Sequence, residues 1–375
     1  MKIMLVKDRN VLNTKFLAQF ANSMTNLGHE VHVVCDTFNK VGSGVELNEQ
    51  IKFTNLNQKI KCPIGNIIRK YREKIKPLTP KRFAKFIKQE NPDVVLCYFM
   101  SDLYNVLHKQ KYDCPIIMMH HKYPPTIIEK LENRSKKKQA DYKAIFEKAT
   151  AHQVLMKSFE ETLSSKYNIQ NIVTIPNEVV QIDEDKLADL EAKKIIYVGR
   201  ISKPGKRQHY LIEAFAKIAK DFPDWSVEFW GLSKYPEYDA ELNKMIKDYD
   251  VKKQVFLKGF TNDINAVYRS ASINAFPSAH EGFGLGLADG MAHGMPAIGF
   301  KSTPAVNELI IDGKNGFLVE DIEEFSKRLK ELMKSYELRK ELGEKARESM
   351  KQFSPEAVIN KWEDFIIEIV DEYEK

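Results

Sequence analysis

Two acidic residues enclose a glycine-rich segment in the second half of this 375-residue chain. Glu281 is followed by Gly282, Gly284 and Gly286, and Asp289 ends the segment. Glycines let backbone N–H groups approach a phosphate closely, and the positive end of a helix dipole stabilises the phosphate charge. The two carboxylates are too far apart in sequence to act as a tight pair, so each would contact a different part of a ligand. The alternative is a glycine-rich turn with two solvated acids.

A basic loop precedes that segment by about eighty residues. Arg200, Lys203, Lys206 and Arg207 follow an apolar run and lead into a helical pattern. In an open α/β sheet, side chains at the carboxyl end of a strand face the ligand crevice. Arg200 offers a bidentate grip on phosphate oxygens and Lys206 a compact positive charge, so together they could offset charge on a leaving diphosphate. The alternative is a solvated basic loop.

Two histidines, His120 and His121, end an apolar run in the first half of the chain. We expect His120 to face the crevice, where it could bind a ligand hydroxyl group or shape an acceptor site. Adjacent strand residues point to opposite faces, so at most one of the two is functional. The alternative is a structural role for both.

Several established motifs are missing from the sequence. No G-x-G-x-x-G follows the first apolar run, and no P-loop, G-x-S-x-G or H-E-x-x-H sequence occurs. The two Asp-x-Asp triplets, at residues 183–185 and 248–250, lie in polar sequence and are interpreted as solvated acids. We therefore expect no metal, and charge neutralisation by Arg200, Lys206 and the helix terminus.

The elements that must position these residues alternate along the chain. Apolar runs predict strands, and helical patterns such as the one at residues 14–27 lie between them, which indicates parallel sheets covered on both faces. The pattern restarts after a polar linker at residues 181–191. The predicted strands span residues 2–6, 30–35, 93–98, 115–120, 153–156 and 172–175, and then 194–199, 226–230, 255–257, 273–275 and 297–300.

The sequence therefore predicts an α/β protein with two doubly wound, Rossmann-like domains facing across a cleft. We expect the first domain at residues 1–178 and the second at residues 190–354. Residues 355–374 form an amphipathic helix with Val358, Trp362 and Phe365 on one face. This helix is expected to pack back on the first domain, so residues 355–375 are assigned to it.

Charge is unevenly distributed in this chain of net charge +6. Eleven basic residues between positions 59 and 88 face a single acid, Glu73, which indicates an anionic partner. One hypothesis is a patch for anionic lipid headgroups beside a lipid-linked acceptor, and the other is a solvated lysine-rich face. Nucleic acid is not expected, since no recognition motif is present. The basic residues are Lys59, Lys61, Arg69, Lys70, Arg72, Lys74, Lys76, Lys81, Arg82, Lys85 and Lys88.

The cysteines and the apolar content predict the cellular setting. Cys35, Cys97 and Cys114 lie in or beside apolar runs and no C-x-x-C pair occurs, so we expect buried free thiols and a reducing compartment. No signal peptide and no apolar stretch of roughly twenty residues is recognisable. A cytoplasmic protein is expected, at most peripheral at the inner face of the cell membrane.

In their order and spacing, these elements resemble the retaining glycosyltransferases of family 4, which have two Rossmann-like domains in the GT-B arrangement. The resemblance is specific between about residues 195 and 319, and in the first half it rests on architecture and His120. Its blocks are Gly199-Arg200, Lys206, LIEAF at 211–215, VFLKGF at 255–260, FPS at 276–278, EGFG at 281–284, GMPAI at 294–298 and NGFLV at 315–319.

The resemblance implies roles for single residues. Arg200 and Lys206 would clamp the diphosphate, and Glu281 matches the first glutamate of the family's E-x₇-E pattern, near the donor sugar. Asp289 matches the second, which binds the ribose, but is an aspartate here. The loop from Arg200 to Lys206 is one residue longer than usual, and residues 8–13 replace glycines after the first strand. Further donor contacts are implied for Gly282, Phe283 and Gly284, and base contacts for Gly259 and Phe260.

The implied activity is that of a hexosyltransferase. A sugar would move from a nucleotide-sugar donor, a UDP-sugar, to a hydroxyl of a glycan or lipid-linked acceptor, with retention at the anomeric carbon and without metal or cofactor. The setting would be bacterial surface glycan or polysaccharide biosynthesis. Two alternatives are a sugar-nucleotide epimerase on the same architecture and a non-catalytic carbohydrate-binding protein with a degenerate site.

Overall fold

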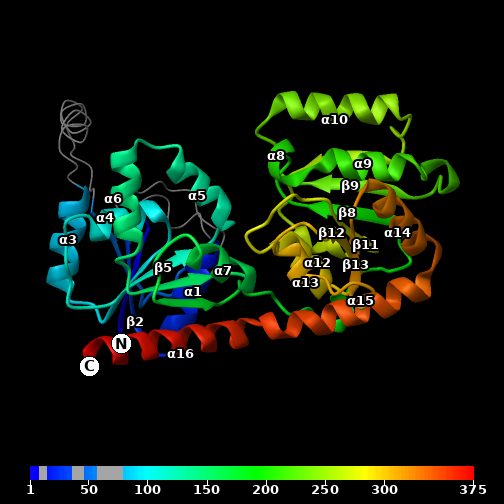
Figure 1. Cartoon of the computed structure of the whole chain (residues 1–375). Coiled ribbons are helices and arrows are strands. Elements are labelled where there is room, and N and C mark those ends of the chain that lie inside the picture. Colours follow the sequence, from blue (N-terminus) through cyan, green and yellow to red (C-terminus); the bar gives the residue numbers. More distant parts are fainter. Residues whose placement is uncertain (8–14, 36–45, 57–78) are drawn as a thin grey trace, which may run out of the picture. The chain divides into compact units, whose positions relative to one another are not determined.

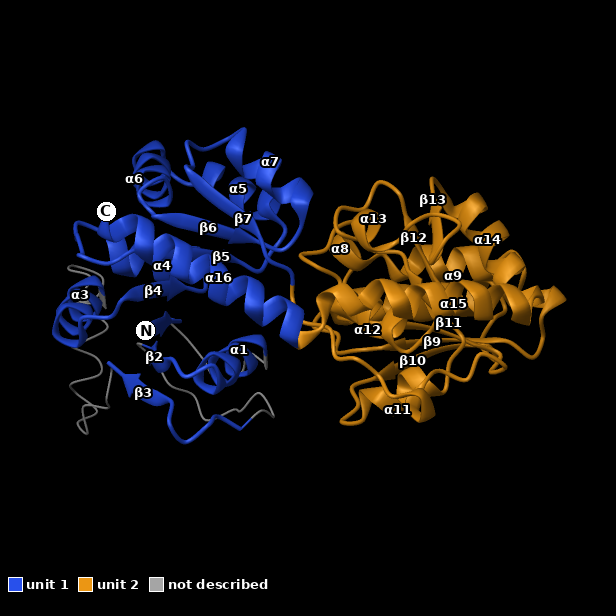
Figure 2. Cartoon of the chain, turned by 90° about the horizontal axis from the view of Figure 1, so that it is seen from below, with its two compact units in different colours: residues 1–176, 356–375 blue, residues 177–355 orange. Residues whose placement is uncertain are grey.

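A computed structural model describes residues 1–7, 15–35, 46–56 and 79–375 of the chain. They divide into two compact units, coloured separately in Figure 2. Unit 1 comprises Met1–Pro176 and Glu356–Lys375, and unit 2 comprises Asn177–Pro355. Residues 8–13, which replace the glycines expected from the resemblance, lie outside the described residues. So do seven of the eleven basic residues between positions 59 and 88.

Unit 1 contains a seven-stranded parallel sheet of order β3-β2-β1-β4-β5-β6-β7. Its register places Ile3 of β1, the third strand in this order, opposite Val31 on one side and Val94 on the other. The strands are β1 (Lys2–Val6), β2 (Glu30–Cys35), β3 (Lys52–Asn55), β4 (Val94–Cys97), β5 (Ile116–His120), β6 (Ala151–Val154) and β7 (Asn171–Thr174). The helices are α1 (Lys15–Asn26), α3 (Thr79–Glu90), α4 (Met100–Leu107), α5 (Pro124–Glu132), α6 (Lys136–Phe146), α7 (Lys157–Ser164) and α16 (Pro355–Glu374).

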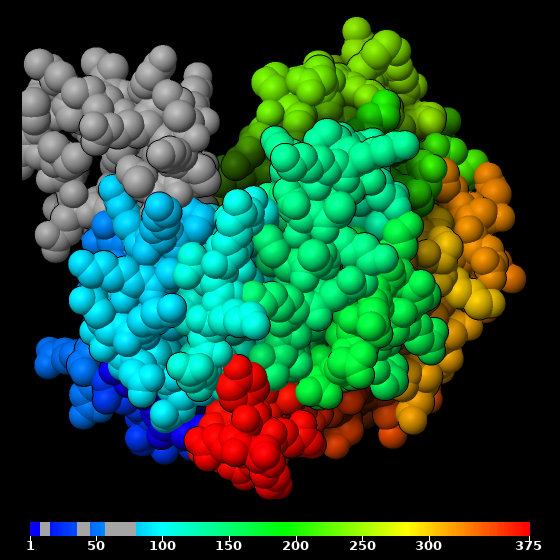
Figure 3. Space-filling view, turned by 60° about the vertical axis from the view of Figure 1, so that its left-hand side comes forward, coloured from blue at the N-terminus to red at the C-terminus, as the bar shows by residue number. Residues whose placement is uncertain are grey.

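The helix α16 completes the core of unit 1, as predicted from its amphipathic pattern (Figure 1). Trp362 is fully buried and meets the ring of Phe20 edge-on, with 5.2 Å between the ring centroids. Near the end of the helix, the Tyr373 hydroxyl donates to the carbonyl of Tyr112 at 3.0 Å. In Figure 3 the red C-terminal end accordingly lies against the cyan part of unit 1.

Unit 2 contains a six-stranded parallel sheet of order β10-β9-β8-β11-β12-β13. Its strands are β8 (Lys194–Val198), β9 (Ser226–Trp230), β10 (Val255–Gly259), β11 (Ile273–Phe276), β12 (Ala297–Phe300) and β13 (Gly316–Val319). Its helices are α8 (Lys203–Lys206), α9 (Gln208–Ala216), α10 (Pro236–Asp248), α11 (Ile264–Arg269), α12 (Leu285–Ala292), α13 (Val306–Leu309), α14 (Ile322–Lys334) and α15 (Tyr336–Met350). Short 3-10 turns are η2 (Glu184–Lys186), η3 (Ala219–Asp221) and η4 (Lys351–Phe353).

The predicted α/β class with two parallel sheets is confirmed. Cys35, Cys97 and Cys114 are buried, as expected, while Cys62 lies outside the described residues. Among the described residues, no helix has the length and apolar character needed to cross a membrane.

Candidate functional site

The strand order of unit 2 defines one topological switch point. β8 lies between β9, which follows it in the chain, and β11, from which the sheet continues in the other direction. Open α/β sheets bind ligands at the carboxyl ends of the strands that flank such a point. We call residues 199–207, after β8, and residues 277–284, after β11, the switch-point loops. They contain the predicted basic loop and the start of the glycine-rich segment.

The two switch-point loops are joined by backbone and side-chain contacts. The backbone N–H of Ala279 donates to the carbonyl of Gly205 at 2.9 Å. Lys206 Nζ lies 2.5 Å from Glu281 Oε1, and the two side chains are 14% and 9% exposed. A charge pair so little exposed to water is screened weakly. The structure therefore brings two predicted site residues, 75 positions apart, into one largely buried ion pair.

Arg200 begins its loop with its backbone fixed and its side chain exposed. Gln208 Nε2 donates to the Arg200 carbonyl at 2.9 Å, and Gln208 is fully buried. The Arg200 guanidinium makes no hydrogen bond or ion pair with any residue in the described part of the chain. In the preceding strand, burial and then the charge of Glu281 raise the pKa of the Tyr197 hydroxyl well above its ordinary value. Arg200 thus offers an uncommitted cation on a rigid backbone.

The helix α12 starts directly after the second loop. Gly284, its N-cap, has a φ of 92°, a left-handed conformation that glycine adopts without strain. A Cβ added at Gly286 would lie 2.1 Å from the carbonyl oxygen of Val198, so no other residue fits there without displacing the helix. The positive end of α12 consequently lies close to the end of β8.

The remaining residues of the glycine-rich segment take different positions. Phe283 is buried, 2% exposed, and meets Phe353 edge-on, so only its backbone is available to a ligand. Asp289 lies half-buried in α12. Burial, and next the charge of Asp289, raise the pKa of the Tyr268 hydroxyl well above its ordinary value. The Tyr268 hydroxyl donates to the carbonyl of Gly286 at 3.3 Å.

The end of β10 carries the predicted base-flanking residues. Gly259 has a φ of 74°, and its carbonyl accepts a hydrogen bond from the backbone N–H of Gly231 at 2.8 Å. The following residue, Phe260, is 65% exposed. An aromatic ring so open to water at a strand's carboxyl end can stack on a planar ligand group.

The position of His120 requires a correction. We expected it to face a crevice, but its imidazole is 1% exposed and its Nε2 lies 3.0 Å from Nδ1 of His152. Burial, and then the neighbouring His152, lower the pKa of His120 well below its ordinary value. Strand alternation instead leaves the next residue, His121, half-buried and stacked on Tyr98 with 4.2 Å between ring centroids.

No group of three or more metal-ligating side chains is found in residues 1–7, 15–35, 46–56 and 79–375. The two acidic triplets behave as solvated acids: the side chain of Asp183 is 70% exposed and pairs with Lys186, and Asp248 pairs with Lys244. The cations of the switch-point loops are Arg200, Lys203, Lys206 and Arg207, and Glu281 pairs with Lys206 between the loops.

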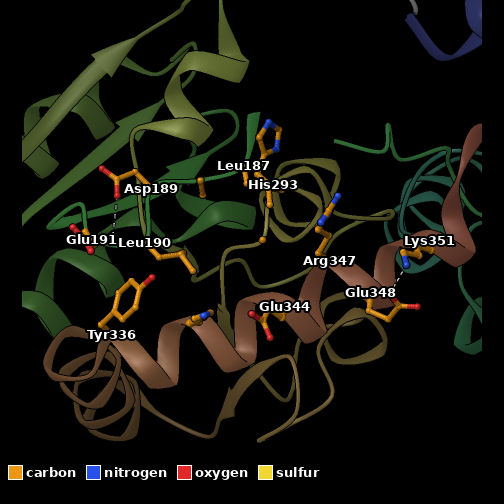
Figure 4. A pocket seen from close by; sticks show the side chains of 13 residues that line it. Leu187, Asp189, Leu190, Glu191, His293, Tyr336, Glu344, Arg347, Glu348 and Lys351 are labelled. Atoms are coloured by element: carbon orange, nitrogen blue, oxygen red, sulfur yellow. Dashed lines mark hydrogen bonds and ion pairs between the residues drawn. The ribbon is translucent and has the colours of Figure 1, made fainter. Parts of the chain in front are cut away.

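A separate cavity of about 440 Å³ lies at the other end of α12 (Figure 4). It is lined by charged residues of mixed sign from α15, including Glu344 and Arg347, and by Asp189 of the segment before β8. His293, which follows α12, also lines it. None of the predicted site residues contributes to this cavity.

Two parallel-sheet units of this kind define the GT-B fold. Residues 14–179 match the family model described as Glycosyltransferase Family 4, and residues 180–349 match the model described as Glycosyl transferases group 1. The chain therefore belongs to glycosyltransferase family 4.

Two relatives support this assignment. An uncharacterized glycosyltransferase of Haemophilus influenzae is 33% identical over 212 residues, 56% of this chain and 59% of that protein. The poly(ribitol-phosphate) alpha-N-acetylglucosaminyltransferase of Staphylococcus aureus is 27% identical over 289 residues, 74% of this chain and 56% of that protein. The chain thus spans less than two thirds of the length of either relative.

The fold is also shared with a crystal structure of a mutant of TarM from S. aureus, in complex with fondaparinux, alpha-GlcNAc-glycerol and UDP. The TM-score is 0.75 at 15% sequence identity, and the match covers 98% of this chain and 100% of that one. At this level of identity, the similarity extends to the fold alone.

Proposed function

We propose that the chain is a retaining, hexosyltransferase-type glycosyltransferase that uses a UDP-sugar. The acceptor would be a hydroxyl of a glycan or lipid-linked molecule in bacterial surface glycan biosynthesis. The observation that carries the proposal is the meeting of Arg200, the Lys206–Glu281 pair and the start of α12 at one switch point. The names of the relatives, one of which transfers N-acetylglucosamine to poly(ribitol-phosphate), and the UDP bound by TarM support the choice of donor and acceptor class.

Each group at the switch point has a place in this reaction. Arg200 and Lys206 would neutralise the diphosphate together with the N-terminus of α12, without a metal ion. Phe260 would stack on the base and Asp289 would accept hydrogen bonds from the ribose hydroxyls. Glu281 would lie at the sugar, beside the bond that breaks.

The transfer itself breaks the bond between the anomeric carbon and the diphosphate oxygen and forms the bond to the acceptor oxygen. The proton of the acceptor hydroxyl passes to the departing diphosphate on the same face of the sugar, so the configuration is retained. The protein contributes by positioning the reactants and stabilising leaving-group charge. We assign acceptor binding to unit 1, where His121 directly follows β5 and stacks on Tyr98.

The test is a panel of UDP-sugars with glycerol-phosphate and saccharide acceptors, in buffer with excess EDTA. We expect UDP release that requires one donor and one acceptor, and NMR of the product should show the anomeric configuration of the donor. Isomerisation of the donor without an acceptor would instead identify an epimerase, and no UDP binding at all would identify a degenerate site. Activity lost in EDTA and restored by a divalent cation would contradict the metal-free arrangement.

We further propose a cytoplasmic enzyme that is drawn to anionic membrane surfaces. The support is α3, which buries Phe83 and Ile87 and exposes Lys81, Lys85 and Lys88. Sedimentation with phosphatidylglycerol vesicles should be strong at low salt and weak at high salt. Absence of binding at either salt concentration would reject this part of the proposal.

A further inference from the structure

We propose that Asn274 is a positioning residue: it fixes how deeply α12 lies on the sheet of unit 2, and thereby places the carboxylate of Asp289. The inference rests on the proposed function, in which Asp289 binds the ribose of the donor. It concerns a residue for which the sequence predicted no role beyond membership of a strand.

Asn274 is an unusual residue for its position. It lies fully buried in the middle of β11, between the apolar residues Ile273 and Ala275. Its Nδ2 donates to the carbonyl of Leu287 at 3.0 Å and to that of Gly286 at 3.2 Å. Its Oδ1 is buried without a hydrogen-bond partner among the described residues. Burial of an amide with one unsatisfied atom costs folding free energy. Both hydrogen bonds of Asn274 go to the start of α12, so we infer that holding this helix is what offsets the cost.

The helix approaches the sheet closely at this point because of two glycines, one turn apart. A Cβ at Gly290 would lie 2.1 Å from Nδ2 of Asn274, and a Cβ at Gly286 would lie 2.1 Å from the carbonyl oxygen of Val198. Glycine inside a helix is destabilising by roughly 0.5–1 kcal/mol relative to alanine. Two of them on the face that meets Asn274 and β8 keep α12 closer to the sheet than any other residues would.

The backbone around Asp289 is held at further points. The Tyr268 hydroxyl reaches the same carbonyl of Gly286 as Asn274 does. At the end of the helix, Nδ1 of His293 lies 2.6 Å from the carbonyl oxygen of Asp289, which it can only contact as a donor. The chain from Gly286 to Asp289 therefore has little freedom to move outward.

The length of the side chain at position 289 makes this depth matter. An aspartate is shorter than a glutamate by one methylene, or about 1.5 Å of reach. Hydrogen bonds weaken steeply when the two heavy atoms separate beyond roughly 3.2 Å. A shift of α12 away from the sheet by a fraction of this difference of about 1.5 Å would take the Asp289 carboxylate out of hydrogen-bond distance of the ribose hydroxyls. An aspartate at position 289 therefore requires the close approach of α12 to the sheet.

The experiment measures UDP affinity by calorimetry for Asn274→Ala and Asp289→Glu, alone and combined. Asn274→Ala should weaken UDP binding about tenfold, because the start of α12 loses two buried hydrogen bonds. In the otherwise unchanged chain, Asp289→Glu should also weaken binding. In the Asn274→Ala background, where the helix can relax outward, Asp289→Glu should instead restore part of the affinity.

The matched control is Asn315→Ala, which removes another buried asparagine of unit 2. Asn315 Nδ2 donates at 3.1 Å to the carbonyl of Leu309, which belongs to α13 and not to α12. This variant should lose comparable stability on urea unfolding and keep its UDP affinity. If Asn274→Ala does not fold, Asn274→Ser takes its place in the same comparison.

Two results would overturn the inference: unchanged UDP affinity in Asn274→Ala, or an equal effect of Asp289→Glu in both backgrounds. Neither can be confused with failure of the proposed function. If the proposed function were wrong, the unsubstituted chain would not bind UDP at all.

Discussion

Replacing Lys206 by methionine removes the positive charge of the switch-point pair while keeping most of the side-chain volume. Two effects should follow. The diphosphate loses a charge-assisted hydrogen bond of about 1.5–3 kcal/mol, which weakens UDP binding by about 10- to 100-fold. Glu281, 9% exposed and 2.5 Å from Lys206 Nζ, is left as a buried charge without its partner. Removal of one member of such a pair costs about 3 kcal/mol of unfolding free energy.

The matched control is Glu281→Gln, which breaks the same ion pair from the other side. It should lower the unfolding free energy to a similar extent, because Lys206 is then the unpaired charge. Its UDP affinity should not fall, since the cation that faces the diphosphate is kept. The double variant, Lys206→Met with Glu281→Gln, should recover much of the lost stability, because no unpaired charge remains.

Urea unfolding and calorimetric titration with UDP measure both effects on the same preparations. UDP affinity in Lys206→Met equal to that of the unsubstituted chain would refute the assignment of Lys206 to the diphosphate. Additive stability losses in the double variant would show that the contact between Lys206 and Glu281 contributes nothing to folding.

Four further predictions follow from the described contacts. Arg200→Ala should reduce UDP release in the transfer assay at least 100-fold, as for loss of one transition-state donor. Its melting temperature should not change, because the side chain is exposed. An active variant would contradict the assignment of Arg200 to the diphosphate. Phe260→Ala should weaken UDP binding by about 1–3 kcal/mol, the range for stacking of one base, and unchanged affinity would exclude base stacking at this exposed ring. Burial lowers the pKa of His152 from 6.5 to about 4, so the unfolded chain takes up the proton first as the pH falls. The free energy of unfolding should therefore decrease between pH 6.5 and pH 4, by about 1.4 kcal/mol per pH unit. Urea unfolding at pH 7.5 and pH 5 should show a weaker pH dependence for His152→Gln than for the unsubstituted chain, and an equal dependence would count against this. Trp362 is fully buried in the core of unit 1, so Trp362→Ala should destabilise this unit by about 3–5 kcal/mol on urea unfolding. A loss below about 1 kcal/mol would mean that α16 contributes little to this core.

Much of the fold could be predicted because most strands are continuous apolar runs. The bounds of β1, β2, β9 and β12, and those of α16, coincide with the predicted ranges. The strand β3 was missed, since Lys52 and Phe53 are exposed at the edge of the sheet and leave no apolar run. The strand β13 was also missed, although its residues lie in the NGFLV block that the resemblance uses. Exposure at the sheet edge removes the hydrophobic signal of β3, whereas β13 is short but apolar and largely buried, so its signal was present and overlooked.

The candidate site residues were named from the sequence by type, but the contacts among them could not be predicted. Nothing in the sequence indicates that Lys206 and Glu281 pair, because the contact depends on the order of β8 and β11 in the sheet. His120 was misjudged since alternation says that neighbours face opposite ways but not which one is buried. Gln208 was missed, and a polar residue at the first position of a predicted helix would have been the signal to look for.

The two cations that would hold the diphosphate, Arg200 and Lys206, differ in a way that bears on the proposed reaction. Lys206 already neutralises Glu281, so it can turn to a diphosphate only as that pair loosens. The carboxylate released in this way would face the positive charge that develops at the anomeric carbon as the diphosphate departs. Arg200 has no competing partner among the described residues and can give its full charge to the leaving group. Loss of Arg200 should therefore lower turnover more than stability, whereas loss of Lys206 should lower both.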